Sequence, residues 1–179
     1  MKFKLLYTIF LFVGIFTNIS ATEVLQKKIG FYVNHSMANV YGVCNEIQIE
    51  PFDLVKKSNL FSLKSSFKIN IPITKISSGD TGRDDHIHEI LGHPNFSQIQ
   101  IQVTSIENQG ERYLVKGNLT IRGTTKPFQS DATAVDTNGN LQVDGKLITK
   151  FSDYKLENPS LLFFKAKEDI EISYSFLLK

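Results

Sequence analysis

Apolar and polar side chains alternate along most of this chain, and this period of two limits the fold more than any other feature of the sequence. The clearest example runs from Phe61 to Ile73, where apolar residues occupy almost every second position and Lys, Ser and Asn stand between them. Successive side chains of a β-strand point to opposite faces, so such a run predicts a strand with one apolar and one wet face. The same pattern recurs in residues 31–33, 43–49, 99–103, 113–121, 141–147 and 170–176. The chain is therefore predicted to be all-β.

Turn residues between these runs predict that neighbouring strands are antiparallel. Asn108-Gln109-Gly110 and Asn138-Gly139 supply the positive φ that tight hairpins need. With a further run over residues 128–135 the count reaches about eight strands, and a sheet of that size with one apolar face can close on itself. We predict a single domain built as an antiparallel, eight-stranded β-barrel.

Residues 83–92 break the pattern and predict one short helix. Ile87, Ile90 and Leu91 have helical spacing, acidic residues stand in the first turn, and Gly92 follows the last apolar position. The apolar stripe of this helix is expected to cap one mouth of the barrel.

Residues 1–21 are predicted to be a secretory signal peptide. Lys2 and Lys4 precede an almost unbroken apolar run over residues 5–16, and a cleavage site follows at Ala21. The apolar run is about a dozen residues, shorter than the roughly 18 to 20 that a membrane-spanning helix needs, so no stable membrane insertion is expected after cleavage. The mature chain, residues 22–179, has the length of one domain and is expected to be periplasmic or secreted.

The charge balance excludes two classes of partner. Lys and Arg together number 20 and Asp and Glu 18, and two of the lysines lie in the predicted signal, so the mature chain carries no net charge. Without a basic excess, neither nucleic acid nor an anionic membrane is predicted as a partner. The only cysteine, Cys44, forms no internal disulfide and is expected to be a small buried side chain. The sequence does not decide between a monomer and a homodimer.

The predicted helix carries the one cluster of metal-ligating residue types, His86 and His88 with nearby acidic residues. On a helix, positions i and i+2 point about 200° apart, so the two histidines do not share a face and no metal site is predicted. Instead, Asp84 and Asp85 are expected to stabilise the helix N-terminus, while Arg83 and His86 hydrogen-bond the helix to the barrel rim.

No pattern in the chain predicts catalysis. Ser36 beside His35, and the serines at 77 and 78, lack the nucleophile elbow and the glycine loop of a hydrolase. The glycines are scattered at turns and form no phosphate-binding or dinucleotide-binding fingerprint, so no cofactor is predicted. We expect a binding protein rather than an enzyme.

Several segments together resemble the YceI-like family, which comprises exported, lipocalin-like barrels whose members bind isoprenoid lipids. In chain order these segments are His35-Ser36, Tyr41-Gly42, Ile76-Ser77-Ser78, Arg83-Asp84-Asp85-His86-Ile87, Pro94 with Phe96, and residues 117–127, which are similar to the family's Gly-x-Leu-Thr-x-x-Gly-x-Thr-Lys-Pro hairpin. The chain departs from the family pattern at Gly42-Val43-Cys44, where Gly-Thr-Phe is usual, and in a shorter connection from the helix to Phe96. The resemblance implies a cavity rather than a filled interior.

The inward faces of the predicted strands supply the candidate binding site. The resemblance implies that an isoprenoid-type lipid, a polyprenyl phosphate or a quinone-like molecule, lies inside the barrel with its head group near a rim. Its tail is expected among apolar residues of five runs: Phe31, Val33, Ile47, Ile49, Phe67, Ile69, Ile71, Ile99, Ile101, Val103, Leu119 and Ile121. The alternative is a barrel whose interior is filled by side chains and that acts through its surface, as an interaction or structural protein.

Overall fold

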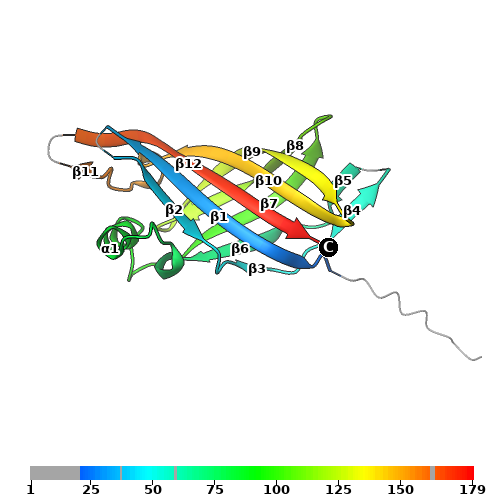
Figure 1. Ribbon diagram of the computed structural model, residues 1–179, viewed down its shortest axis with the longest axis horizontal. Helices are drawn as coiled ribbons and strands as arrows, with labels where there is room; N and C mark the ends of the chain where they lie inside the picture. Colours follow the sequence, from blue (N-terminus) through cyan, green and yellow to red (C-terminus); the bar gives the residue numbers. More distant parts are fainter. Residues whose placement is uncertain (1–20, 37, 59, 162–163) are drawn as a thin grey trace, which may run out of the picture.

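The computed structural model describes residues 21–36, 38–58, 60–161 and 164–179, so residues 1–20 of the predicted signal peptide lie outside the described residues. The described chain is mostly antiparallel β-strand with one short α-helix, which confirms the predicted fold class (Figure 1). The strands are β1 (Val24–His35), β2 (Val40–Cys44), β3 (Gln48–Ile49), β4 (Leu54–Lys57), β5 (Leu60–Leu63), β6 (Phe67–Pro72), β7 (Gln98–Asn108), β8 (Tyr113–Ile121), β9 (Thr124–Thr137), β10 (Asn140–Lys150), β11 (Ser160–Leu161) and β12 (Phe164–Leu178). The helices are α1 (Thr81–Ile90) and two 3₁₀ turns, η1 (Ile73–Lys75) and η2 (Ser152–Tyr154).

One antiparallel sheet makes up the body of the molecule and curls into a half-barrel. Its strand order is β2-β1-β12-β10-β9-β8-β7-β6-β3, and β11 pairs with the beginning of β12. Strands β6 to β10 follow one another in sequence and in space. Short turns join β7 to β8, β8 to β9 and β9 to β10, whereas residues 73–97, with η1 and α1, join β6 to β7. The described strands outnumber the eight expected because bends divide two of the predicted runs and because β4 and β11 lie outside all of them.

The first divided run is residues 43–49. Val43 lies in β2, which pairs with β1, whereas Ile49 lies in β3, which pairs with β6 at the other edge of the sheet. Cys44 and Ile47 are both buried although they stand three residues apart, so residues 45–47 shift the alternation by one position. The prediction of one continuous strand over residues 43–49 is therefore wrong. A single bent segment instead crosses the opening of the half-barrel from β1 to β6.

The second divided run is residues 61–73. Phe61 belongs to β5, which forms a separate two-stranded hairpin with β4, and Phe67 begins β6 of the main sheet. Residues 64–66 bend between them, and the Lys64 amide donates to the Asp53 carbonyl at 3.1 Å. Because this bend contains three residues, the alternation continues through it and conceals it. Ile73 likewise begins η1 instead of extending the strand.

Two hairpin turns have left-handed residues at both central positions. Asn138 and Gly139, with φ of 55° and 82°, join β9 to β10 as predicted. Arg122 and Gly123, with φ of 49° and 74°, join β8 to β9. Positive φ at both central residues is the geometry of the type I′ turn, whose twist matches that of the flanking strands.

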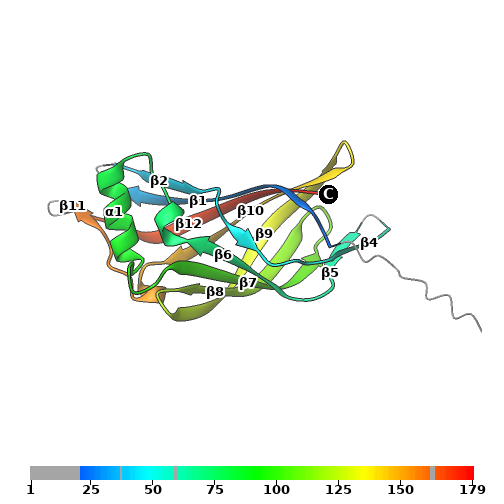
Figure 2. The same cartoon turned by 90° about the horizontal axis from the view of Figure 1, so that it is seen from below.

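The predicted helix forms as α1 and lies at one end of the half-barrel, while the β4–β5 hairpin lies at the opposite end (Figure 2). Asp80 caps it by accepting from the Arg83 amide at 2.8 Å. Ile90 is buried, and Ile87 and Leu91 pack against the core, so the helix turns its apolar stripe toward the barrel.

The side chains that join α1 to the rim are Asp84 and His88, and not Arg83 and His86 as predicted. Asp84 accepts 2.6 Å hydrogen bonds from the Ser77 hydroxyl and from both the hydroxyl and the amide of Ser78. These bonds hold the pKa of the Asp84 carboxyl below its ordinary value. A ring nitrogen of His88 lies 2.9 Å from the Ile76 carbonyl oxygen. Side chains of the helix therefore hold the turn over residues 76–78 by hydrogen bonds. Ser77 also exchanges two backbone hydrogen bonds with Val43 of β2.

Candidate ligand-binding site

The interior of the half-barrel contains two cavities that follow one another along its length. The hairpin-side cavity has a volume of about 100 Å³ and is lined by residues toward the β4–β5 end: Val24, Ile29, Ile49, Phe52, Leu54, Phe67, Ile69, Ile101, Val103, Ile106, Val115, Phe128, Val143, Leu147, Ile172, Tyr174, Phe176 and Leu178. The helix-side cavity has a volume of about 60 Å³ and is lined by Ile29, Gly30, Phe31, Cys44, Ile71, Ile76, Ile99, Ile101, Leu119, Ile121 and Ile172. Almost every lining side chain is aliphatic or aromatic, so the site suits an apolar guest.

Ten of the twelve residues predicted to surround a lipid tail line these cavities. Ile49, Phe67, Ile69 and Val103 line the hairpin-side cavity, Phe31, Ile71, Ile99, Leu119 and Ile121 the helix-side cavity, and Ile101 both. Val33 and Ile47 are buried in the core, with 5% and 1% of their surface exposed, and line neither of the two. The structure thus brings most of the predicted set together around one interior.

The predicted set leaves out one wall of the interior, formed by β10 and β12. That wall contributes Val143, Leu147, Ile172, Tyr174, Phe176 and Leu178 to the hairpin-side cavity. The sequence signal that could have found them is the alternation over residues 141–147 and 170–176, which puts these apolar side chains on one face of each strand. The register shows that this face is inward, because Phe31 of β1 lies directly opposite Ile172 of β12.

The one phenol in the lining is satisfied within the wall. Ser130, which is 2% exposed, donates its single hydroxyl proton to the Lys146 carbonyl at 2.8 Å, so it accepts from the Tyr174 hydroxyl at 3.0 Å. Burial raises the pKa of Tyr174 above its ordinary value, which keeps the phenol neutral. The ring therefore presents only its apolar face to the cavity.

Three aromatic rings lie flat against the wall because the residue opposite each is glycine. Phe31 faces Gly42, Phe128 faces Gly117 and Tyr174 faces Gly145, each pair directly across two neighbouring strands. A Cβ at any of these glycines would stand within 2.8 Å of the ring. The missing side chains thus let the rings cover the backbone instead of projecting into the interior, a known device for glycine in β-sheets.

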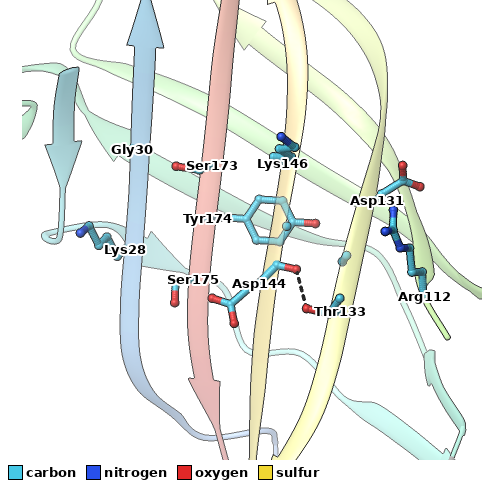
Figure 3. A pocket seen from close by; sticks show the side chains of 12 residues that line it. Lys28, Gly30, Arg112, Asp131, Thr133, Asp144, Lys146, Ser173, Tyr174 and Ser175 are labelled. Carbon is cyan, nitrogen blue, oxygen red and sulfur yellow. Dashed lines mark hydrogen bonds between the residues drawn. The ribbon is translucent and has the colours of Figure 1, made fainter. Parts of the chain in front are cut away.

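The outer face of β1, β12, β10 and β9 carries a separate hollow of about 490 Å³ (Figure 3). Small residues such as Gly30 and Ser173 form its floor, and charged side chains such as Lys28 and Asp131 stand around it. The hollow is open to solvent, so it does not exclude water from a guest as the interior cavities do. We therefore place the candidate site inside the half-barrel.

The histidines of α1 have partners that account for them. His86 Nδ1 lies 3.8 Å from a Glu89 carboxylate oxygen, and His88 contacts the Ile76 carbonyl as described above. In the described residues, no group of three or more His, Cys, Asp or Glu side chains gathers that could hold a metal ion. None of the helices in the described part of the chain has the length and apolarity needed to cross a membrane.

Comparison with known proteins agrees with this architecture. The sequence profile of the YceI-like domain matches residues 22–177. The chain belongs to the YceI-like family. A UPF0312 protein of Shewanella oneidensis is 33% identical to this YceI-like chain over 121 residues, which cover 64% of the chain and 60% of the relative. A UPF0312 protein of Serratia proteamaculans is 33% identical over 75 residues, or 40% of the chain and 39% of the relative. The matches thus span 60% or less of these relatives' length.

Solved structures share the fold of this YceI-like chain at low sequence identity. BcnA of Burkholderia cenocepacia matches 84% of the chain and 95% of its own length, with a TM-score of 0.68 and 16% identity. A polyisoprenoid binding domain from Saccharophagus degradans, implicated in plant cell wall breakdown, matches 89% of the chain and 98% of its own length, with a TM-score of 0.63 and 12% identity. At these identities the likeness shows the fold alone.

Proposed function

We propose that this YceI-like protein binds an isoprenoid-type lipid, a polyprenyl phosphate or a quinone-like molecule, with its tail in the interior of the half-barrel. The observation that carries the proposal is the pair of apolar cavities, which together run along the interior. The structural likeness to a polyisoprenoid binding domain supports the same ligand class. The protein acts here as a carrier or scavenger rather than as an enzyme.

The chemistry of the lining suits retention of a hydrocarbon tail. Each buried methylene contributes about 0.8 kcal/mol, so even one five-carbon isoprene unit is held by about 4 kcal/mol. The Tyr174 phenol is already hydrogen-bonded to Ser130, so the tail leaves no polar group of this pair unsatisfied. An interior of this kind retains many apolar tails, and we place the recognition of the head group at the rim.

The cavity volumes also define a second candidate function. An engineered apolar cavity of about 150 Å³ takes up benzene, and each of the two cavities here is smaller, at about 100 and 60 Å³. If the interior did not widen, the protein would be a barrel with a nearly filled core that acts through its surface. Lipid binding requires that side chains move, and a tail too long for one cavity requires that the two cavities join.

Analysis of purified protein by native mass spectrometry separates these two functions. Lipid carriage predicts a bound species that is released by organic solvent and contains isoprene units. A wild-type protein that yields no lipid from its natural source, and that takes up none when incubated with isoprenoid alcohols, contradicts carriage and supports the filled barrel.

We further propose that the protein works outside the cytoplasm, after removal of residues 1–21. Thr22 supports this boundary, because it is the first of the described residues whose hydrogen bonds tie it to the fold: its amide donates to the Phe52 carbonyl at 2.9 Å and its hydroxyl accepts from the Leu54 amide at 3.1 Å. Sequencing the N-terminus of protein recovered from the extracytoplasmic fraction is expected to find Thr22 or a neighbour. Intact Met1 on cytoplasmic protein would refute export.

A further inference from the structure

Three isoleucines separate the two interior cavities. Ile29, Ile101 and Ile172 line both the hairpin-side and the helix-side cavity, so they stand at the boundary between them. Ile29 and Ile101 are each 7% exposed, and Ile172 packs against the same core.

The order of the lining residues along each strand places this boundary at one position along the length of the half-barrel. On β7, Ile99 lines only the helix-side cavity, Ile101 lines both, and Val103 lines only the hairpin-side cavity. On the antiparallel neighbour β6, the residues paired with Ile99 and Val103 are Ile71 and Phe67, and each lines the same single cavity as its partner. Two residues along a strand advance about 7 Å, so the passage from one cavity to the other occupies about one residue pair.

The three side chains come from two opposite walls. Ile29 and Ile172 lie on the adjacent strands β1 and β12, where Ile172 pairs with Phe31, two residues from Ile29. Ile101 lies on β7, and Figure 2 shows β6 and β7 on the side of the half-barrel away from β1 and β12. Side chains from two opposite walls therefore meet at the boundary and narrow the interior there.

We propose that Ile29, Ile101 and Ile172 form an internal constriction that determines how long an isoprenoid tail the protein accepts. This inference rests on the proposed lipid binding. A short tail occupies the hairpin-side cavity, and a longer tail enters the helix-side cavity only by displacing these side chains. Isoleucine is branched at Cβ and strongly prefers one χ1 rotamer, so the displacement is resisted. Tail length, rather than apolar character alone, then becomes a property that the interior distinguishes.

The chain offers matched variants to test this constriction. Ile101→Ala removes a side chain of the boundary, whereas Ile69→Ala and Ile99→Ala remove the same atoms from the hairpin-side and the helix-side cavity alone. All three isoleucines are buried, with 5 to 8% of their surface exposed, and lie on the paired strands β6 and β7. Differences in lipid affinity between the variants therefore reflect where the side chain was removed and not how much volume was lost.

The probes are geraniol, farnesol and geranylgeraniol, which contain two, three and four isoprene units, with affinity measured by titration calorimetry. In the wild type, we expect the gain in affinity per added unit to fall off once the hairpin-side cavity is full. In Ile101→Ala, the ratio of geranylgeraniol to geraniol affinity is expected to be at least tenfold larger than in the wild type. The two control variants are expected to keep the wild-type ratio within about threefold. If Ile101→Ala does not fold by circular dichroism, Ile101→Val is expected to change the ratio in the same direction.

A second readout reports where the tail ends. Cys44 lines the helix-side cavity and is the only cysteine of the chain, so its alkylation by iodoacetamide measures occupancy of that cavity. At equal saturation, geranylgeraniol is expected to slow alkylation of Ile101→Ala more than geraniol does. Equal length profiles in Ile101→Ala and both controls would overturn the constriction while leaving lipid binding intact. Failure of the wild type to bind any of the alcohols would instead overturn the proposed function.

Discussion

Gly145→Ala tests whether the aromatic ring opposite a glycine shapes the interior. A Cβ at position 145 would stand 2.3 Å from both Cζ and the hydroxyl oxygen of Tyr174, closer than any real contact. The ring must therefore leave the wall and swing toward the hairpin-side cavity, and its hydrogen bond to Ser130 breaks. Crowding of this kind lowers the free energy of unfolding by about 1 to 3 kcal/mol, and loss of the hydrogen bond lowers it by about 1 kcal/mol. Replacing glycine by alanine in a strand raises it by about 0.5 to 1 kcal/mol. We expect a net loss of about 2 kcal/mol in the free energy of unfolding.

Urea denaturation measures this loss, and Gly30→Ala is its matched control. A Cβ at position 30 would meet the Ser173 hydroxyl at 3.2 Å and the Gly42 carbonyl at 3.4 Å, and the hydroxyl can rotate away. Because alanine in a strand gains about 0.5 to 1 kcal/mol over glycine, this control is expected to be neutral or to raise stability by up to about 1 kcal/mol. In a Tyr174→Ala background the cost of Gly145→Ala is expected to vanish, because the ring it displaces is gone. Equal costs of Gly145→Ala with and without the ring would refute the reasoning.

Three further predictions concern a turn, the helix and the lining. Gly139→Val places a branched side chain at φ 82° and is expected to lower stability by about 1 kcal/mol or more in urea denaturation; an unchanged midpoint contradicts the turn assignment. The lowered pKa of Asp84 stabilises the attachment of α1 above about pH 4, and this contribution is lost as the pH falls through the folded-state pKa. The protection of α1 amides against hydrogen exchange, taken relative to the intrinsic exchange rate at each pH, is therefore expected to fall in acid for the wild type, and to be low and nearly independent of pH in Asp84→Ala. Ile69→Gln is expected to leave a folded barrel by circular dichroism but to retain less lipid per mole, while the outward Lys68→Gln retains it all; an unfolded Ile69→Gln with a lipid-free wild type would favour the filled core.

The local features of the fold were predictable because they depend on neighbours in sequence. Gly139 shows its turn through the preference of Asn-Gly for positive φ, and α1 shows itself through the spacing of Ile87 and Ile90. The bend at residues 64–66 was not predictable from periodicity, because three intervening residues preserve the alternation between Leu63 and Phe67. A period of two records which face a residue occupies but not whether the strand continues.

The interior was predictable in composition but not in arrangement. Ile101 is recognisably inward from the alternation of β7, yet its place between two cavities depends on which side chains stand across the interior on β1 and β12. The pairing of Tyr174 with Gly145 likewise depends on the register of β10 against β12, over strands separated by a long stretch of chain. Pairings of this kind are set by the whole sheet, so no short segment contains them.

The segment joining β2 to β3 is the place where the wall of the half-barrel can most easily move, because among the described residues no continuous hydrogen-bond ladder crosses it. In a barrel closed by continuous hydrogen-bond ladders, the circumference follows from the number and stagger of the strands, so the interior has one width. Here β2 is bonded to β1 and β3 to β6, and the two ladders meet only through residues 45–47. Besides the Val43–Ser77 bridge and the exposed Glu46–Lys75 ion pair at 3.0 Å, side-chain packing, whose single contacts are weak, supports the other side of this segment in the described chain. If the proposed lipid binding holds, we expect guests of different thickness to be accommodated by movement along this line, while the long strands β7 to β10 and β12 keep their register.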